Sequence, residues 1–183
     1  MDIVLTYRGR IPAKRSDREA VWAIRREFHT QLAKLWGKEP FSVLRRWEDS
    51  NFEAGAPHFT RHWRDQTFVP FLGEDVGVGA NIDITLLTGM PAKKRVVSSG
   101  DLDNRIKRLI DALRVPKGEG EMVESLPADA RWYCLLEDDD VVISVTARLG
   151  AYLASDDPAE AFAFIRVRPS ALRVTLSNLS MLF

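Results

Sequence analysis

The sequence has one cysteine, Cys134, so the chain cannot form an internal disulfide bond. The residues around Cys134 are apolar, and we expect its thiol to be buried. Histidine is scarce as well, with three in the whole chain. His58 and His62 are four positions apart, but no cysteine or carboxylate is placed to complete a zinc site with them. We therefore expect surface or capping histidines at these two positions.

The chain also lacks a net charge, because 26 basic and 26 acidic residues give a formal charge of +0. No overall field attracts nucleic acid, so any contact with DNA must come from local basic patches. No apolar run is long enough to span a membrane, and nothing resembles a signal peptide. We therefore expect a cytoplasmic protein without a membrane contact.

Apolar residues make up 45% of the 183 residues, which is enough to bury the core of one domain spanning residues 1–183. Alternating and continuous apolar runs predict strands, and spacings of three and four residues predict helices. The predicted strands are 3–7, 80–87, 141–149, 161–167 and a last one at 171–176, and the predicted helices are 16–36 and 101–113. The capping box at Ser16 begins the first helix, and Gly37 ends it. This order predicts an α+β fold, a mixed β-sheet with two main helices packed on it.

The pattern loses its period between residues 41 and 79, although the segment is too apolar for disorder. We interpret it as an inserted subregion of short elements at about residues 41–79. Basic and aromatic residues alternate at Arg45–Trp47 and Arg61–Arg64, as in proteins that bind single strands, and a hydrophobic cluster with a basic rim fits equally well. The segment 114–134 reads as a long polar loop.

The predicted helix 101–113 has two distinct faces. Its apolar face is formed by residues at helical spacing: Leu102, Ile106, Leu109, Ile110 and Leu113. Asp103, Lys107 and Asp111 follow at steps of four on another face, while Asp101 and Asn104 lie at the helix start. An N-cap at Asp101 and a solvated ladder of ion pairs would explain this pattern without any function.

A second acidic cluster, Glu137–Asp140, runs directly into the β-branched strand that begins at Val141. Four carboxylates in a row repel one another unless a cation collects them. Mg²⁺ or Mn²⁺ suits this task, because hard cations take oxygen ligands and are often held by a few carboxylates plus water. We therefore expect the two acidic clusters to meet in space.

The run Gly100–Leu113, with its Gly-Asp-Leu-Asp-Asn-x-x-Lys-x-x-x-Asp-Ala-Leu spacing, resembles the RusA-type Holliday-junction resolvases. The later pair of carboxylates before Val141 and Val142 matches the same family. Its members are homodimeric, Mg²⁺-dependent endonucleases that cut four-way DNA junctions. Two departures are the Glu137 that replaces the first Asp of the usual pair and the length of the segment 114–134.

The resemblance implies a RusA-like fold, a homodimer, and Mg²⁺ as the cofactor with Mn²⁺ as a substitute. It implies metal-binding catalytic carboxylates at Asp101, Asp103 and Asp138, and a catalytic lysine at Lys107. Supporting roles fall on Asn104, Asp111 and Glu137. The expected DNA contacts are basic residues before and within the helix: Lys93, Lys94, Arg95, Arg105 and Arg108.

Two other functions stay open at this point. A nuclease of the same fold could act on flaps, forks or other branched DNA, and the segments 41–79 and 114–134 are where such a change would lie. A catalytically silent DNA-binding or assembly protein could keep the scaffold. The apolar C-terminus, which includes Met181, Leu182 and Phe183, needs a cover from the body of the protein or from a partner chain, and this adds to the expectation of a homodimer.

Overall fold

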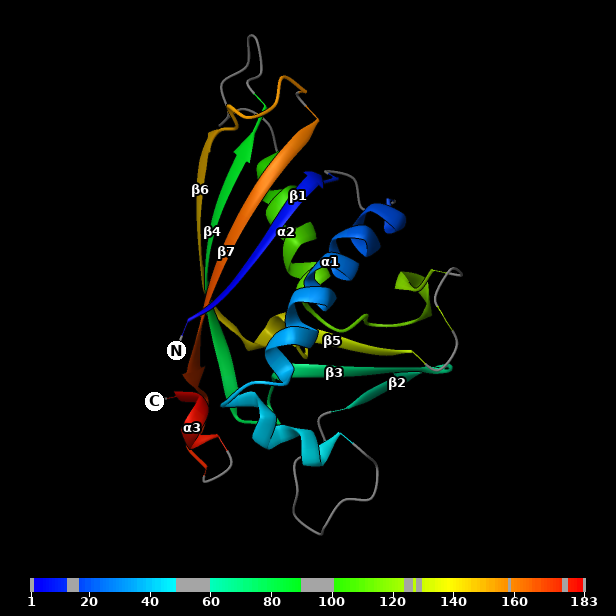
Figure 1. Cartoon of the computed structure of the whole chain (residues 1–183), viewed down its shortest axis with the longest axis vertical. Coiled ribbons are helices and arrows are strands. Elements are labelled where there is room, and N and C mark those ends of the chain that lie inside the picture. The colour runs from blue at the N-terminus through cyan, green and yellow to red at the C-terminus, as the bar shows by residue number, and fades with distance from the viewer. Residues whose placement is uncertain are drawn as a thin grey trace.

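The computed structural model describes residues 2–12, 17–48, 60–89, 101–123, 127, 130–157, 159–175 and 178–182. Two helices and two mixed β-sheets of four and three strands give an α+β fold (Figure 1). The elements in chain order are β1 (Ile3–Arg10), α1 (Arg18–Trp36), the 3-10 helix η1 (Phe41–Trp47), β2 (Arg61–Trp63), β3 (Gln66–Leu72), β4 (Val78–Thr88), α2 (Asp101–Leu113), the 3-10 turn η3 (Glu119–Glu121), β5 (Arg131–Leu136), the 3-10 turn η4 (Asp139–Val141), β6 (Val142–Ala151), β7 (Glu160–Ala171) and the short α3 (Leu179–Leu182).

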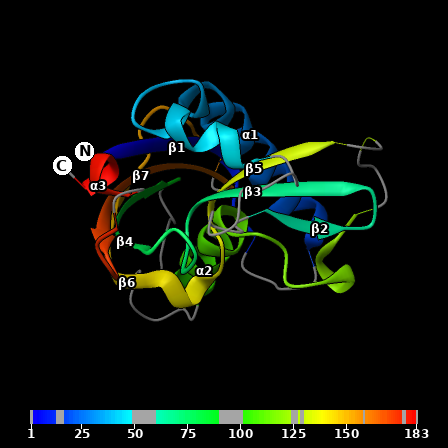
Figure 2. The same ribbon diagram turned by 90° about the horizontal axis from the view of Figure 1, so that it is seen from below.

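The four-stranded sheet has the order β1-β7-β4-β6. Strand β4 pairs antiparallel with β7 and parallel with β6, so it separates β6 from β7 although these two follow each other in the sequence. The reason is the alternation in β4: Ile82, Ile84 and Leu86 are at most 1% exposed, which places this strand at the buried centre of the sheet. Both long helices cover the same face of the sheet (Figures 1 and 2).

The second sheet has the order β2-β3-β5, with β3 and β5 parallel. The sequence predicts one sheet, and the structure has two. In β3, Phe68, Val69 and Phe71 are all 0% exposed, so the run does not alternate. A strand buried on both faces reads as a continuous apolar run, which is why the sequence pattern does not reveal it. Strand β5 also ends in consecutive buried residues, so its sequence does not alternate clearly either. It begins inside the segment that is predicted to be a loop.

The helix α1 begins at Arg18 with Asp17 as its N-cap, one residue after the predicted Ser16. The Asp17 carboxylate accepts a hydrogen bond from the Ala20 N–H (3.2 Å), and Gly37 is the C-cap as predicted. The helix α2 has the predicted bounds. Its Leu109 and Leu113 are 0% exposed, so the predicted apolar face does pack into the core.

The C-terminal part of the chain is only partly covered by the body of the protein, because Leu172, Val174 and Leu179 are exposed. Residues 172–175 form no strand, so the predicted strand 171–176 is wrong in the part that the structure describes. Asn178 is fully buried, and its Nδ2 donates to the backbone carbonyls of Val76 (2.7 Å) and Arg173 (2.9 Å). Met181 of α3 is buried as well. In the described ranges, no helix has the length and apolar character that crossing a membrane requires.

Candidate functional site

An open groove of about 490 Å³ lies between α2 and the start of β6. Its polar lining residues are Asp103, Lys107, Asp111 and Asp139, and we call it the acidic groove. The apolar part of its lining comes from α2 and β6: Leu102, Ile106, Ile110, Val142, Val145 and Ala147. The groove therefore brings the predicted polar face of α2 together with the second acidic cluster.

Asp103 and Lys107 lie one helical turn apart on α2, and both are exposed. Within the described part of the chain, Lys107 makes no ion pair, so its charge stays available to a ligand in the groove. Asn104 is also exposed. Asp101 begins the helix, but its side chain lies outside the description, as do Lys93, Lys94 and Arg95.

The turn at Asp138 and Asp139 is held by a lysine that the sequence analysis did not single out. The Nζ of Lys117 lies 2.8 Å from Asp138 Oδ1 and 2.6 Å from Asp139 Oδ1. Asp138 is the N-cap of η4, and its Oδ1 accepts a hydrogen bond from the Asp139 N–H (2.6 Å). The cation that relieves the repulsion between these two carboxylates is thus an ammonium group.

Backbone pairing explains why Lys117 reaches this turn. After α2 the chain runs beside the end of β5, where Arg114 bridges to Leu136 and the Val115 N–H donates to the Leu136 carbonyl (3.1 Å). Lys117 follows two residues later, and Asp138 follows Leu136 at the same interval. Lys117 lies in a loop between a proline and a glycine, and this sequence does not indicate that its ammonium group pairs with Asp138 and Asp139.

The electrostatics of the turn favour the charged forms of its groups. The pKa of Asp139 is lowered to about 2, first by its hydrogen bond with Asp138 and then by Lys117. The pKa of Lys117 is raised, first by its hydrogen bond to Asp138 and then by that to Asp139. Asp139 is therefore an anionic oxygen donor throughout the physiological pH range.

Glu137 faces a neighbouring hollow of about 220 Å³, whose lining includes Asp138 and Lys117. Its carboxylate pairs with Arg61, and its Oε2 accepts a hydrogen bond from the Glu74 N–H (3.0 Å). Glu137 is thus held by β2 and by the turn after β3. The predicted supporting role of Glu137 remains a prediction. Asp138 lines this hollow, and the next residue, Asp139, lines the acidic groove.

Asp111 and Arg108 are tied to each other at the inner side of α2. Arg108 is 7% exposed, and its Nη1 lies 2.5 Å from Asp111 Oδ2. Arg114 Nη2 lies 3.2 Å from the other oxygen of Asp111. The guanidinium of Arg108 is therefore held by Asp111, and its predicted contact with DNA stays a prediction. Arg105 is half-buried.

The residues of the two acidic clusters fit a hard divalent cation by their chemistry. Carboxylate oxygens are the ligands that Mg²⁺ prefers, and Lys117 shows that two of these carboxylates already converge on one cation. Over the residues that the structure describes, no three His, Cys, Asp or Glu side chains are placed together to hold a metal. This statement does not cover the whole predicted set of Asp101, Asp103 and Asp138, because the side chain of Asp101 is not among those that the structure describes.

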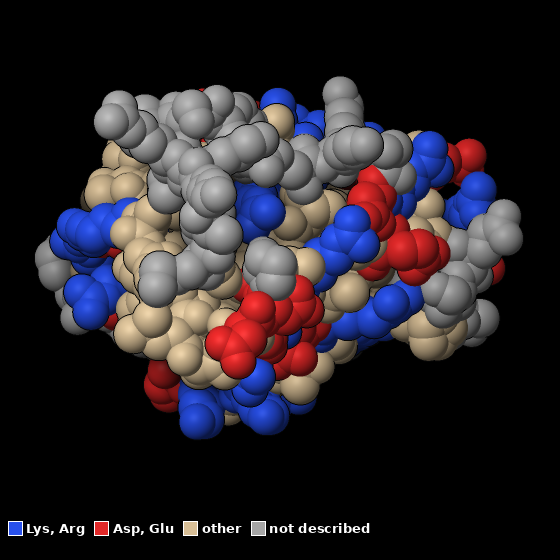
Figure 3. All heavy atoms as spheres, turned by 90° about the horizontal axis from the view of Figure 1, so that it is seen from above, with Lys and Arg blue, Asp and Glu red and all other residues tan. Residues whose placement is uncertain are grey.

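The surface around the site carries charges of both signs. Seen from above, acidic clusters are bordered by lysine and arginine, and neither sign dominates the visible face (Figure 3). This agrees with the formal net charge of +0. A DNA contact near the site must therefore be local and short-ranged.

Comparison of the chain with protein-family models found no match, and comparisons with curated proteins and with solved structures found none either. The resemblance to the RusA-type resolvases thus depends on the motif around α2 and on the carboxylates before β6.

Proposed function

We propose that this protein is a metal-dependent endonuclease that hydrolyses phosphodiester bonds in branched DNA, with four-way junctions as its substrate. One observation carries the proposal: Asp103 of α2 and Asp139 before β6 line the same groove, although they are far apart in the sequence. Convergent carboxylates beside a free lysine suit phosphoryl chemistry, in which a metal and a cationic side chain act on one phosphate.

The roles of the residues follow from their positions. Asp103 and the turn of Asp138 and Asp139 would hold Mg²⁺, or Mn²⁺ in its place, with Asp101 adding a ligand at the start of α2. When bound, the metal supplies Lewis-acid polarisation of the phosphate and a water of lowered pKa. Lys107 is close to Asp103 on the same groove and would stabilise charge on the scissile phosphate.

The junction substrate and the dimer come from the resemblance, and one surface feature supports the dimer. Strand β6 lies at the edge of its sheet, and its Ile143 and Val145 are 50% and 43% exposed. Edge strands with exposed β-branched residues pair readily with another chain. Two copies related by a two-fold axis would match the two-fold symmetry of a four-way junction.

Incubation of the protein with labelled four-way, flap, fork and linear DNA, each with and without Mg²⁺, tests this function. We expect Mg²⁺-dependent cleavage of the four-way junction and loss of cleavage in Asp103→Asn. Lys34→Ala, a change at the far end of α1, is the matched control and should cleave normally. Cleavage of flaps or forks in preference to junctions would select the related nuclease function. Absence of cleavage on every substrate would contradict the proposal.

One contact favours a second candidate, a catalytically silent DNA-binding or assembly protein. Lys117 satisfies the charges of Asp138 and Asp139, so this turn is stable without a metal. A silent protein would bind junction DNA equally well with and without Mg²⁺ and cleave none. Gel-shift measurements beside the cleavage assay separate the two functions.

A further inference from the structure

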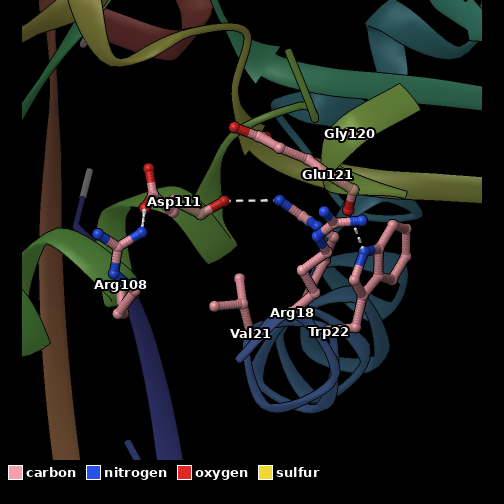
Figure 4. A pocket seen from close by; sticks show the side chains of 8 residues that line it. Arg18, Val21, Trp22, Arg108, Asp111, Gly120 and Glu121 are labelled. Carbon is pink, nitrogen blue, oxygen red and sulfur yellow. Dashed lines mark hydrogen bonds and ion pairs between the residues drawn. The ribbon is translucent and has the colours of Figure 1, made fainter. Parts of the chain in front are cut away.

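A second hollow, of about 490 Å³, lies between α1, the C-terminal part of α2 and η3 (Figure 4). Six of its lining residues matter for its chemistry, and together they define what we call the arginine pocket: Arg18, Arg25, Arg108, Asp111, Gly120 and Glu121. Figure 4 shows Arg108 and Asp111 at one side of the pocket and Arg18 and Glu121 at the other. The Nε1 of Trp22 donates to the Glu121 carbonyl (2.7 Å) and joins α1 to η3.

Positive charge exceeds negative charge around this pocket. Arg114 packs behind it and uses its Nη2 to pair with Asp111 (3.2 Å) and with Glu121 (2.8 Å). Arg108 also pairs with Asp111. The four guanidinium groups of Arg18, Arg25, Arg108 and Arg114 thus face two carboxylates, which leaves two positive charges unmatched.

Two of these arginines are buried and incompletely hydrogen-bonded. Arg25 is 2% exposed and Arg108 is 7% exposed, and both line the pocket. The Nε of each is buried and has no hydrogen-bond acceptor in the described part of the chain. A buried donor without an acceptor costs free energy, so the protein itself compensates these two guanidinium groups only in part.

Arg25 contacts two backbone carbonyls and an aromatic ring, and none of these partners carries a full negative charge. Its Nη2 donates to the carbonyls of Asp111 (2.6 Å) and Arg114 (3.3 Å), at the C-terminal end of α2, and its guanidinium lies 4.6 Å from the Trp22 ring centre. Burial lowers the pKa of Arg25 to about 10, because its charge is removed from water.

Arg18, at the opening of the pocket, is the third arginine of its lining. It is exposed, and it forms no ion pair with any residue that the structure describes. It can therefore close over a bound anion without losing an existing contact. The pocket thus combines two buried arginines in its wall with one exposed arginine at its opening.

We propose that the arginine pocket binds a terminal phosphate group, carried by a small molecule or by the phosphorylated end of a nucleic acid. A phosphate monoester carries close to two negative charges at neutral pH, which matches the surplus of the pocket. Guanidinium groups recognise phosphate through paired hydrogen bonds. The volume, about 490 Å³, is in the range of pockets that hold a whole small molecule, so there is room for the group that carries the phosphate.

This inference does not depend on the proposed nuclease function. Asp111 is the one residue common to the two hollows, and its carboxylate is engaged with arginines of the pocket. The protein can bind phosphate in this pocket without cleaving DNA, and it can cleave DNA without binding phosphate in this pocket.

Isothermal titration calorimetry with two pairs of probes tests the inference. The first pair is adenosine 5′-monophosphate and adenosine, and the second is one oligonucleotide with a 5′-phosphate or a 5′-hydroxyl. We expect the phosphorylated member of at least one pair to bind at least about tenfold more tightly, because only it supplies the dianion. A gain in the first pair identifies a free nucleotide as the source, and a gain in the second identifies a nucleic-acid end. Equal binding within both pairs, or no binding of any probe, would overturn the inference.

Two glycines, Gly118 just before η3 and Gly120 within it, allow a matched pair of variants. A Cβ on Gly120 or on Gly118 meets no atom within 4 Å, so a side chain fits at both, but only Gly120 lines the pocket. Gly120→Glu adds a negative charge at the pocket and should weaken phosphate binding at least about tenfold. Gly118→Glu adds the same charge outside the pocket and should bind like the wild type, while Gly120→Gln, of the same size without the charge, shows how much of the loss is due to bulk alone. If Gly120→Glu binds as tightly as Gly120→Gln, charge recognition in this pocket is excluded.

Arg18→Ala gives an independent test, since this side chain is exposed and forms no ion pair with the residues that the structure describes. We expect about tenfold weaker phosphate binding with an unchanged unfolding midpoint. Unchanged affinity for the phosphorylated probe would contradict the role of the pocket opening.

Discussion

The acidic groove and the arginine pocket adjoin along α2, where they share Asp111, and they differ in how their charges are compensated. In the groove, Asp103 has no ion pair within the described ranges, and Lys107 is equally unengaged. In the pocket, both carboxylates are paired with arginines and the excess charge is positive. The groove thus offers a carboxylate without an ion pair in the described part of the chain, and the pocket offers an excess of positive charge.

Asp111 shows what this difference teaches about the motif. Its place in the sequence, four residues after Lys107, puts it with the groove, and it does line the groove. Its two oxygens, however, pair with Arg108 and Arg114. Asp111 therefore pairs with arginines at the C-terminal end of α2, and the proposed metal ligands of the groove are Asp103 and the turn at Asp139.

The largest expected effect is on the groove side. Asp103→Asn keeps the shape of the side chain but removes the charge that a hard cation needs. We expect junction cleavage to fall at least about a thousandfold, on the order of 4 kcal/mol in transition-state stabilisation. Single-turnover cleavage rates at saturating Mg²⁺ measure it, with junction binding checked by gel shift. Asp138→Asn should lose cleavage in the same way, and full cleavage by either variant would place the metal elsewhere.

The next effect concerns the pocket side and the stability of the fold. Arg25→Met fills a similar volume but leaves the carbonyls of Asp111 and Arg114 without their donor. We expect the free energy of unfolding to drop by about 3 kcal/mol, measured by urea denaturation. Arg18→Met, on the same helix and exposed, is the control and should change stability by less than about 0.5 kcal/mol. Equal effects of the two substitutions would mean that burial of Arg25 is not what matters.

A smaller effect should separate Lys117 from the metal. If Lys117 competes with Mg²⁺ for Asp138 and Asp139, then Lys117→Gln should tighten Mg²⁺ binding by about tenfold, because a cation leaves the site. Calorimetric titration of Mg²⁺ into both proteins measures the change, with Lys34→Gln as the matched control. Weaker Mg²⁺ binding by Lys117→Gln would show that the lysine supports the metal site instead.

The smallest effect is the dependence of stability on pH. The pKa of Asp139 is about 2 in the folded protein, below the value of 3.8 for the free group. A lowered folded-state pKa adds stability that is fully present above about pH 4 and is lost as the pH falls toward about 2. Thermal unfolding midpoints between these values should therefore fall less steeply in Lys117→Gln than in the wild type. Identical slopes would show that the pair of Lys117 with Asp139 does not form in solution.

The sequence predicts the parts of the fold that have a clear period. The bounds of α2 and the strand that contains Ile82 and Ile84 follow from regular spacing, and Gly37 ends α1 as its context indicates. The β3–β5 sheet was missed because strands buried on both faces lose their alternation. For the same reason, residues 60–79 looked like an irregular insertion, whereas Phe68 and Phe71 belong to the buried core.

The candidate site divides in a similar way. Carboxylates at helical spacing are visible in a sequence, so Asp103 and Lys107 could be named in advance. Lys117 could not, because its position depends on the bridge between Arg114 and Leu136, a contact made only after folding. Arg25 was also invisible, since an arginine among apolar helix positions gives no sign that it will be buried against the end of α2.

The most direct test of the central claim, that two acidic clusters act on one cation, is the anomalous scattering of Mn²⁺ in crystals of the protein. We predict one peak bonded to a carboxylate oxygen of Asp103 and to one from the turn of Asp138 and Asp139, with bond lengths of roughly 2.0–2.2 Å. A peak bonded to only one of the two clusters, or no peak at millimolar Mn²⁺, would contradict the account.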